Sequence, residues 1–114
     1  MAIPLQLTFR GMDPSDFVAD AVRFRLDRLE HFEHRIQHCT VVVEQPNHSH
    51  RHGQTFHVRI DLSIPDRVIT VAHDPALDPT HTNVYVAIAD AFRAARRQLQ
   101  DHSRIERGDV KARA

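Results

Sequence analysis

The segment TFHVRIDLSIP, residues 55–65, alternates strictly between apolar and polar side chains. Its apolar positions are Phe56, Val58, Ile60, Leu62 and Ile64. Successive side chains of a β-strand point to opposite faces of a sheet, so this period of two predicts a strand with one buried face. A second layer must cover that face, which restricts the chain to folds that pack other elements against a sheet.

Three further segments predict strands. Residues 5–10, LQLTFR, alternate in the same way, and residues 37–45 are rich in β-branched side chains. Residues 68–73, VITVAH, follow a PDR turn and return as the last strand. Turns join the last three strands, so we expect these to be antiparallel. A helical connection allows the first strand to lie parallel to a neighbour.

Two segments have helical periodicity. The first follows GMDPSD, with Asp13 as a plausible N-cap before Pro14 and Ser15 as the alternative cap, and it runs to about His31. The second covers residues 83–102. Apolar residues three and four apart give each helix one buried stripe. The stripes consist of Val18, Val22, Leu26, Leu29 and Phe32 in the first, and Tyr85, Ile88, Phe92, Ala95 and Leu99 in the second.

The order strand, helix, three strands, helix predicts an α+β fold of the βαβββα type. Because every strand has one apolar face and each helix one stripe, we expect a four-stranded sheet with two helices packed on one face. A chain of 114 residues suits one domain. We assign residues 1–107 to it. Residues 108–114 lack apolar periodicity and are expected to form a flexible C-terminal tail.

Several classes of function are not supported by the sequence. No apolar run approaches the roughly 20 residues of a membrane span, and the N-terminus lacks the layout of a secretory signal. We therefore expect a cytoplasmic protein without a membrane partner. The single cysteine, Cys39, excludes an internal disulfide and lies in an apolar run, as a buried thiol does. No nucleophile elbow, phosphate-binding loop or paired-carboxylate pattern occurs, so we expect neither an enzyme, a small-molecule substrate nor a cofactor.

The segment PNHSHRHGQTFH, residues 46–57, is rich in histidine and is expected at the tip of a hairpin. Three interpretations remain open. The tip is simply exposed and polar; or His50, its neighbouring histidines and Arg51 contact phosphates; or His48, His50 and His52 bind a metal ion. Zinc needs about four converging ligands, which the sequence does not supply, so we predict no metal site. A metal-binding or protein-interaction module that uses residues 48–52 remains the alternative function.

Nearly all of the basic residues are arginine, and several of them lie on the two predicted helices. The formal net charge is zero, yet 14 of the 15 basic residues are arginine, which favours planar contacts to phosphate or carboxylate. If the helices pack side by side, their arginines form one basic ridge that can follow a phosphate backbone. The ridge would comprise Arg25, Arg28, Arg93, Arg96 and Arg97. Alternatively these are solvated faces with local partners, such as Asp101 for Arg97.

The two helices also resemble those of the ribosome hibernation promoting factor family, whose members are also called ribosome-associated inhibitors or sigma-54 modulation proteins. The resemblance covers about residues 5–102. In the second helix the matching residues are Tyr85, Ala87, Ile88, Arg97, Gln98 and Leu99. In the first helix they are Arg25, Leu26, Arg28, Leu29, Glu30 and Phe32. This sequence has Ala89 and Ala94 where the family usually has an acidic residue and a lysine.

The resemblance implies a double-stranded-RNA-binding-like domain of the family's short form. Such a protein occupies the mRNA and tRNA groove of the small ribosomal subunit and inhibits translation under stress or in stationary phase. By this resemblance Arg25, Arg28 and Arg97 are the expected rRNA contacts. Helix geometry adds Arg93 and Arg96 to the expected rRNA contacts, and the predicted hairpin adds His50 and Arg51.

Overall fold

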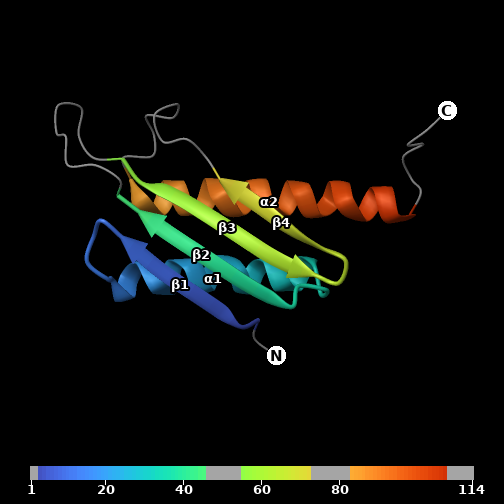
Figure 1. Cartoon of the computed structure of the whole chain (residues 1–114), viewed down its shortest axis with the longest axis horizontal. Coiled ribbons are helices and arrows are strands. Elements are labelled where there is room, and N and C mark those ends of the chain that lie inside the picture. The colour runs from blue at the N-terminus through green and yellow to red at the C-terminus, as the bar shows by residue number, and fades with distance from the viewer. Residues whose placement is uncertain (1–2, 46–54, 73–82, 108–114) are drawn as a thin grey trace.

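The computed structural model describes residues 3–45, 55–72 and 83–107, and it confirms the predicted order of elements (Figure 1). The strands and helices are, in chain order, β1 (Leu5–Arg10), α1 (Asp16–Phe32), β2 (His38–Glu44), β3 (His57–Ile64), β4 (Arg67–Ala72) and α2 (Val84–Arg107). The four strands form one sheet in the order β1-β2-β3-β4. Strand β1 is parallel to β2, which the helical connection allows, and the other neighbours are antiparallel, as expected.

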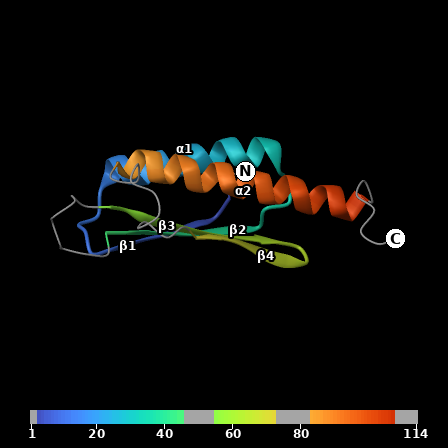
Figure 2. The same ribbon diagram turned by 90° about the horizontal axis from the view of Figure 1, so that it is seen from above.

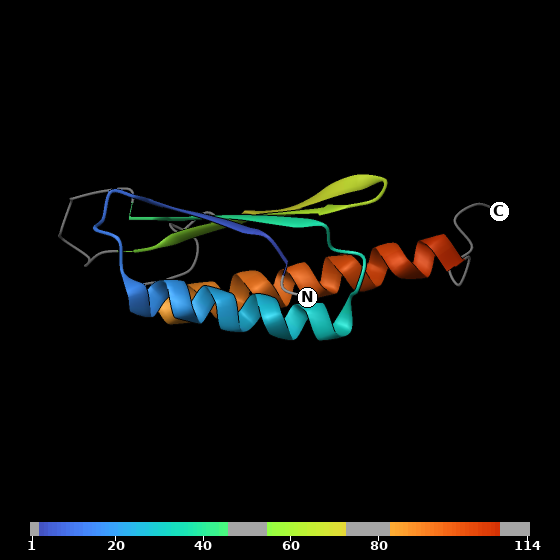
Figure 3. The same cartoon turned by 90° about the horizontal axis from the view of Figure 1, so that it is seen from below.

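The register of the sheet brings its apolar side chains into rows. Leu7 pairs with Val41, Val41 pairs with Ile60, and Ile60 pairs with Val71. Paired residues project from the same face, so this row crosses all four strands on the side that the helices cover. Both helices lie on that one face and leave the other open, as Figures 2 and 3 show. The predicted two-layer architecture is therefore confirmed.

The core lies between the sheet and the two helices. Val22 and Leu26 of α1, and Ile88 and Leu99 of α2, are almost completely buried there. Burying a leucine or isoleucine side chain contributes roughly 1.5–3 kcal/mol, so these contacts fix the helices on the sheet. Cys39 is also buried, as predicted, and burial raises the pKa of its thiol to about 12.

Side-chain caps determine where the helices begin. Ser15 is the N-cap of α1, and its Oγ accepts a hydrogen bond from the backbone N–H of Val18 at 3.2 Å. The prediction of Asp13 as the cap is wrong, because the capping oxygen must precede the first helical residue directly, and α1 begins at Asp16. At the start of α2, Asn83 Oδ1 accepts a hydrogen bond from the N–H of Tyr85 at 2.8 Å.

A carboxylate connects the end of α1 to α2. Glu33 is buried, and its Oε2 accepts hydrogen bonds from the backbone N–H and the Nε of Arg35 at 2.9 and 3.0 Å. Arg35 also donates to Ser103 Oγ of α2 at 3.2 Å. Burial raises the pKa of Glu33, but the hydrogen bonds from Arg35 outweigh it, so the pKa lies below its ordinary value. This charged connection fixes one end of the helix pair.

Two stripe predictions and one helix boundary need correction. Tyr85 is 47% exposed, because the buried face of α2 is centred on small residues such as Ala91 and Ala95, which let the helix approach the sheet. Phe32 is 38% exposed at the last residue of α1. Helix α2 also continues to Arg107 instead of ending near residue 102, so Arg104 is part of the helix.

Candidate nucleic-acid interface

A groove lies between the two helices on the side of the molecule away from the sheet. It has a volume of about 490 Å³, and we call it the arginine groove. Its cationic residues are Arg25 and Arg28 from α1 and Arg93 and Arg96 from α2. Its other lining residues are Leu29, His31, Ala89 and Phe92. Four of the five arginines that sequence placed on a common ridge therefore line one groove.

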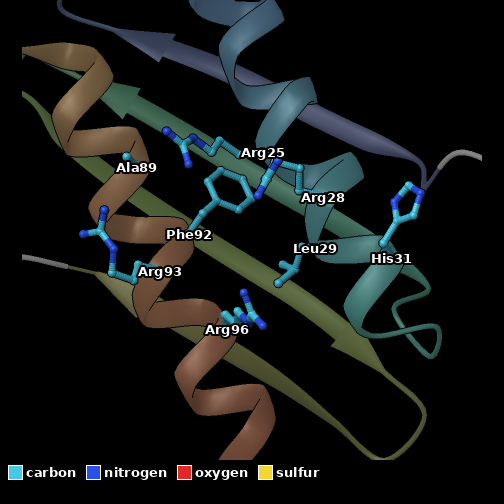
Figure 4. Close-up of a pocket in the computed structure, with 8 residues that line it drawn as sticks. All are labelled: Arg25, Arg28, Leu29, His31, Ala89, Phe92, Arg93 and Arg96. Atoms are coloured by element: carbon cyan, nitrogen blue, oxygen red, sulfur yellow. The ribbon is translucent and has the colours of Figure 1, made fainter.

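The close-up of the groove shows how these side chains lie (Figure 4). Arg25 and Arg28 extend from α1 toward the side of α2 where the ring of Phe92 projects. Arg93 points away from α1, and His31 points outward near the end of α1. The apolar residues Leu29 and Phe92 are buried, so the groove has an apolar floor and a cationic rim.

Aromatic rings support three of these guanidinium groups. The Arg96 guanidinium carbon lies 4.4 Å from the centre of the Phe32 ring, a contact that joins α2 to the end of α1. The guanidinium carbons of Arg25 and Arg28 lie 5.9 and 5.6 Å from the centre of the Phe24 ring. An exposed contact of this kind contributes about 0.5–1 kcal/mol and leaves the positive charge in place.

Carboxylates pair with few of the groove arginines. Among residues 3–45, 55–72 and 83–104, no carboxylate forms an ion pair with Arg25, Arg28 or Arg96. Arg93 does form one, with Asp90 one turn earlier. The interpretation of solvated faces with local partners thus fits Arg93 but not the other three, and the groove retains a surplus of positive charge.

Arg97 lies outside the groove lining. It is exposed and follows Arg93 by four residues, so it projects from the outer face of α2 beside the groove. The partner expected for it, Asp101, instead forms an ion pair with Arg104 at 3.7 Å. An i,i+3 pair was available to Asp101 only because α2 continues past residue 102.

The sequence interpretation missed the aromatic residues of this surface. Phe24 lies off the apolar stripe of α1 and immediately precedes Arg25. A large apolar residue outside the stripe and next to arginines is the signal that could have identified it. Phe32 was assigned to the stripe and therefore to the core, whereas its ring supports Arg96.

Most of the histidine-rich segment, residues 46–57, lies outside the described residues. The predicted contacts His50 and Arg51, and the possible ligands His48 and His52, lie outside the described residues. Within the described part of the chain, no group of three or more histidine, cysteine, aspartate or glutamate side chains is placed to bind a metal ion. None of the described helices is both long and apolar enough to span a membrane.

Comparison with solved structures shows the same fold. The N-terminal domain of Protein Y from Thermus thermophilus superposes with a TM-score of 0.67 at 20% sequence identity, covering 90% of this chain and 99% of that one. A ribosomal subunit interface protein from Coxiella burnetii gives a TM-score of 0.71 at 15% identity, covering 89% of this chain and 98% of that one. No curated protein matches this sequence.

The family comparison uses sequence alone and covers most of the chain. The pattern described as "Sigma 54 modulation protein / S30EA ribosomal protein" matches residues 5–106, which include every strand and nearly all of both helices. This family consists of ribosome-associated proteins that are not enzymes, in agreement with the prediction for this chain. The chain therefore belongs to the sigma-54 modulation and S30EA ribosomal protein family.

Proposed function

We propose that this protein binds rRNA of the small ribosomal subunit through the arginine groove and inhibits translation under stress or in stationary phase. In this proposal it occupies the groove of the small subunit where mRNA and tRNA bind. Family membership supports association with the ribosome. The observation that carries the proposal is that Arg25, Arg28, Arg93 and Arg96, from two helices, line one groove.

The chemistry of the groove suits a phosphate backbone. Guanidinium groups form charge-assisted, bidentate hydrogen bonds with phosphate oxygens. Those of Arg25, Arg28 and Arg96 rest near aromatic rings, so they are partly oriented without being neutralised. An RNA backbone can follow two parallel rows of such donors, with Arg97 beside them. Inhibition then needs no catalysis, because an occupied site excludes mRNA and tRNA.

Counterion release gives this proposal a measurable signature. Each phosphate that a cation neutralises lowers the slope of log K against log salt by about 0.7–0.9. Five arginine contacts, from the four groove residues and Arg97, therefore predict a slope near −4. Any contacts from His50 and Arg51 would steepen it further.

Charge reversal in the groove tests the proposal. We expect the double variant Arg25→Glu/Arg96→Glu to lose about 30-fold or more in affinity for small subunits, since removing one arginine–phosphate contact costs about 1 kcal/mol or more. Co-sedimentation through sucrose at low salt provides the measurement. The control Arg10→Glu/Arg59→Glu makes the same change in net charge at two exposed strand residues. It should bind within about twofold of the wild type, allowing for its weaker long-range attraction.

Two results would contradict the proposal. The wild-type protein could remain at the top of the gradient while ribosomes sediment, or the two double variants could lose equal affinity. The location needs a separate measurement, in which mRNA and initiator tRNA are bound first. If the protein still binds these occupied subunits at full affinity, it does not use the mRNA and tRNA groove.

A further inference from the structure

Phe24 is an exposed aromatic residue on the helical face that carries the groove arginines. The residue is 55% exposed, although phenylalanine is ordinarily among the more buried residue types. It does not belong to the buried stripe of α1, whose buried members are Val18, Val22, Leu26 and Leu29. The core therefore gives no reason for a large aromatic side chain at this position.

Two cations lie near the Phe24 ring. The guanidinium carbons of Arg25 and Arg28 are 5.9 and 5.6 Å from its centre. At these distances neither guanidinium group is in close contact with the ring. The Phe32 ring is different, because Arg96 approaches its centre to 4.4 Å and Phe32 is less exposed. Phe24 thus presents an aromatic surface that is open to a further planar group.

We infer that Phe24 stacks against an unpaired RNA base while Arg25 and Arg28 bind the phosphates that flank it. This inference rests on the proposed binding of rRNA and adds a base contact to the backbone contacts. Aromatic side chains between cations are the arrangement by which proteins bind unpaired nucleotides, because every base offers a planar face. Arginine neighbours favour a polyanion over an apolar protein segment as the partner.

The same helix provides a matched control. Phe17 lies seven residues before Phe24, two helical turns away on the same outer face, and is 79% exposed. Unlike Phe24, it has no cation–π contact among the described residues. Its neighbours Asp16 and Asp20 are acidic, which disfavours a phosphate there. If the outer face of α1 binds an apolar protein surface, substitution of either phenylalanine should weaken binding. If it binds a base between phosphates, only substitution of Phe24 should weaken binding.

Binding to purified small subunits over a range of salt concentrations tests the inference. We expect Phe24→Ala and Phe24→Leu to weaken binding about tenfold at fixed salt, as removal of one base–aromatic stack does. The slope of log K against log salt should stay at the wild-type value, because both variants keep every arginine that binds phosphate. Phe24→Tyr should bind within twofold of the wild type. Phe17→Ala should do the same, and thermal melting should show all four variants folded.

Other outcomes would overturn the inference in distinguishable ways. Wild-type affinity of Phe24→Leu would show that no aromatic face is needed. An equal loss in Phe17→Ala would indicate an apolar docking surface for a protein. A shallower salt slope in Phe24→Ala would mean that the ring only positions Arg25 and Arg28. In each case the charge-reversal variant would still lose binding, whereas failure of the proposed function would appear as absent wild-type binding.

Discussion

The helical face and the open face of the sheet hold their cations in different ways. On the sheet, Arg59 forms an ion pair with Asp61 at 3.4 Å, and the same carboxylate accepts a hydrogen bond from Thr70 Oγ1 at 2.6 Å. His57 faces Glu44 at 4.0 Å across two strands. On the helices, Arg93 and Arg104 also pair with carboxylates. The guanidinium groups of Arg25, Arg28 and Arg96, by contrast, lie near the rings of Phe24 and Phe32.

Because of this difference, the helical face attracts anions more strongly than the open face of the sheet. A carboxylate neutralises the arginine that it pairs with, whereas an aromatic ring orients a guanidinium group and leaves its full charge available. A chain with zero net charge can therefore still carry a strongly cationic surface. The bulk charge of the sequence does not reveal that surface, because among the described residues no carboxylate forms an ion pair with Arg25, Arg28 or Arg96.

The largest expected effect is on stability and concerns the ion pair between Glu33 and Arg35. Glu33→Gln should lower the free energy of unfolding by about 2 kcal/mol, because it weakens the charged hydrogen bonds from Arg35. Chemical denaturation at pH 7 provides the measurement. Glu30→Gln, one turn earlier in α1, is the control and should change stability by less than about 0.5 kcal/mol. Affinity for small subunits should not change, and a loss there would show that the Glu33–Arg35 pair also shapes the binding surface.

The pH dependence of that stability has a definite sign. The pKa of Glu33 is lower in the folded protein than in the unfolded chain, so its stabilisation is complete above the unfolded pKa. It is lost as the pH falls through the lowered folded pKa. The wild type should therefore exceed Glu33→Gln in stability at neutral pH, and this difference should shrink in acid.

A second experiment compares a ring-supported arginine directly with a carboxylate-paired one. Arg25→Ala should weaken binding to small subunits about tenfold and reduce the magnitude of the salt slope by about 0.7–0.9. Arg59→Ala on the sheet should leave both quantities near their wild-type values. Salt titrations of the two variants in parallel provide the measurement. If both variants changed affinity and salt slope equally, the helical face and the sheet would not differ in how they bind the small subunit.

The smallest expected effect on affinity comes from giving a helical arginine a carboxylate partner, as arginine has on the sheet. Gln100→Glu places a carboxylate four residues after Arg96 on an exposed position of α2. We expect a loss of about threefold in affinity at low salt, which should disappear as salt screens the new pair. Gln6→Glu adds the same charge at an exposed residue of β1 and should have no measurable effect. A loss that persists at high salt would indicate a steric rather than an electrostatic cause.

Periodicity predicted most of the fold because it reports directly on burial. The alternation in residues 55–65 and the stripes of both helices gave the correct layers and the correct covered face. The errors occur at the ends of elements. Asp13 and Ser15 can both cap a helix, and only the backbone path selects Ser15. Tyr85 fits the stripe spacing, but the alanines of α2 set the face that meets the sheet.

The candidate site was predicted in part. Arg25, Arg28, Arg93 and Arg96 were placed together because off-stripe residues of adjacent helices must emerge near one another. Which of these arginines pair with a carboxylate could not be predicted. Asp90 reaches Arg93, and Asp101 reaches Arg104 rather than Arg97, and these choices depend on rotamers and on where α2 ends. The contacts of His50 and Arg51 stay predictions.

The spacing of apolar residues along the chain specifies the elements, their order and the face that each one buries. The groove between the helices exists only once both helices are packed on the sheet. The contact of Arg96 with Phe32 depends on that packing, because the two residues are far apart in the chain. The contacts of Arg25 and Arg28 with Phe24 are local to α1, but their distances depend on side-chain rotamers that the apolar pattern does not encode.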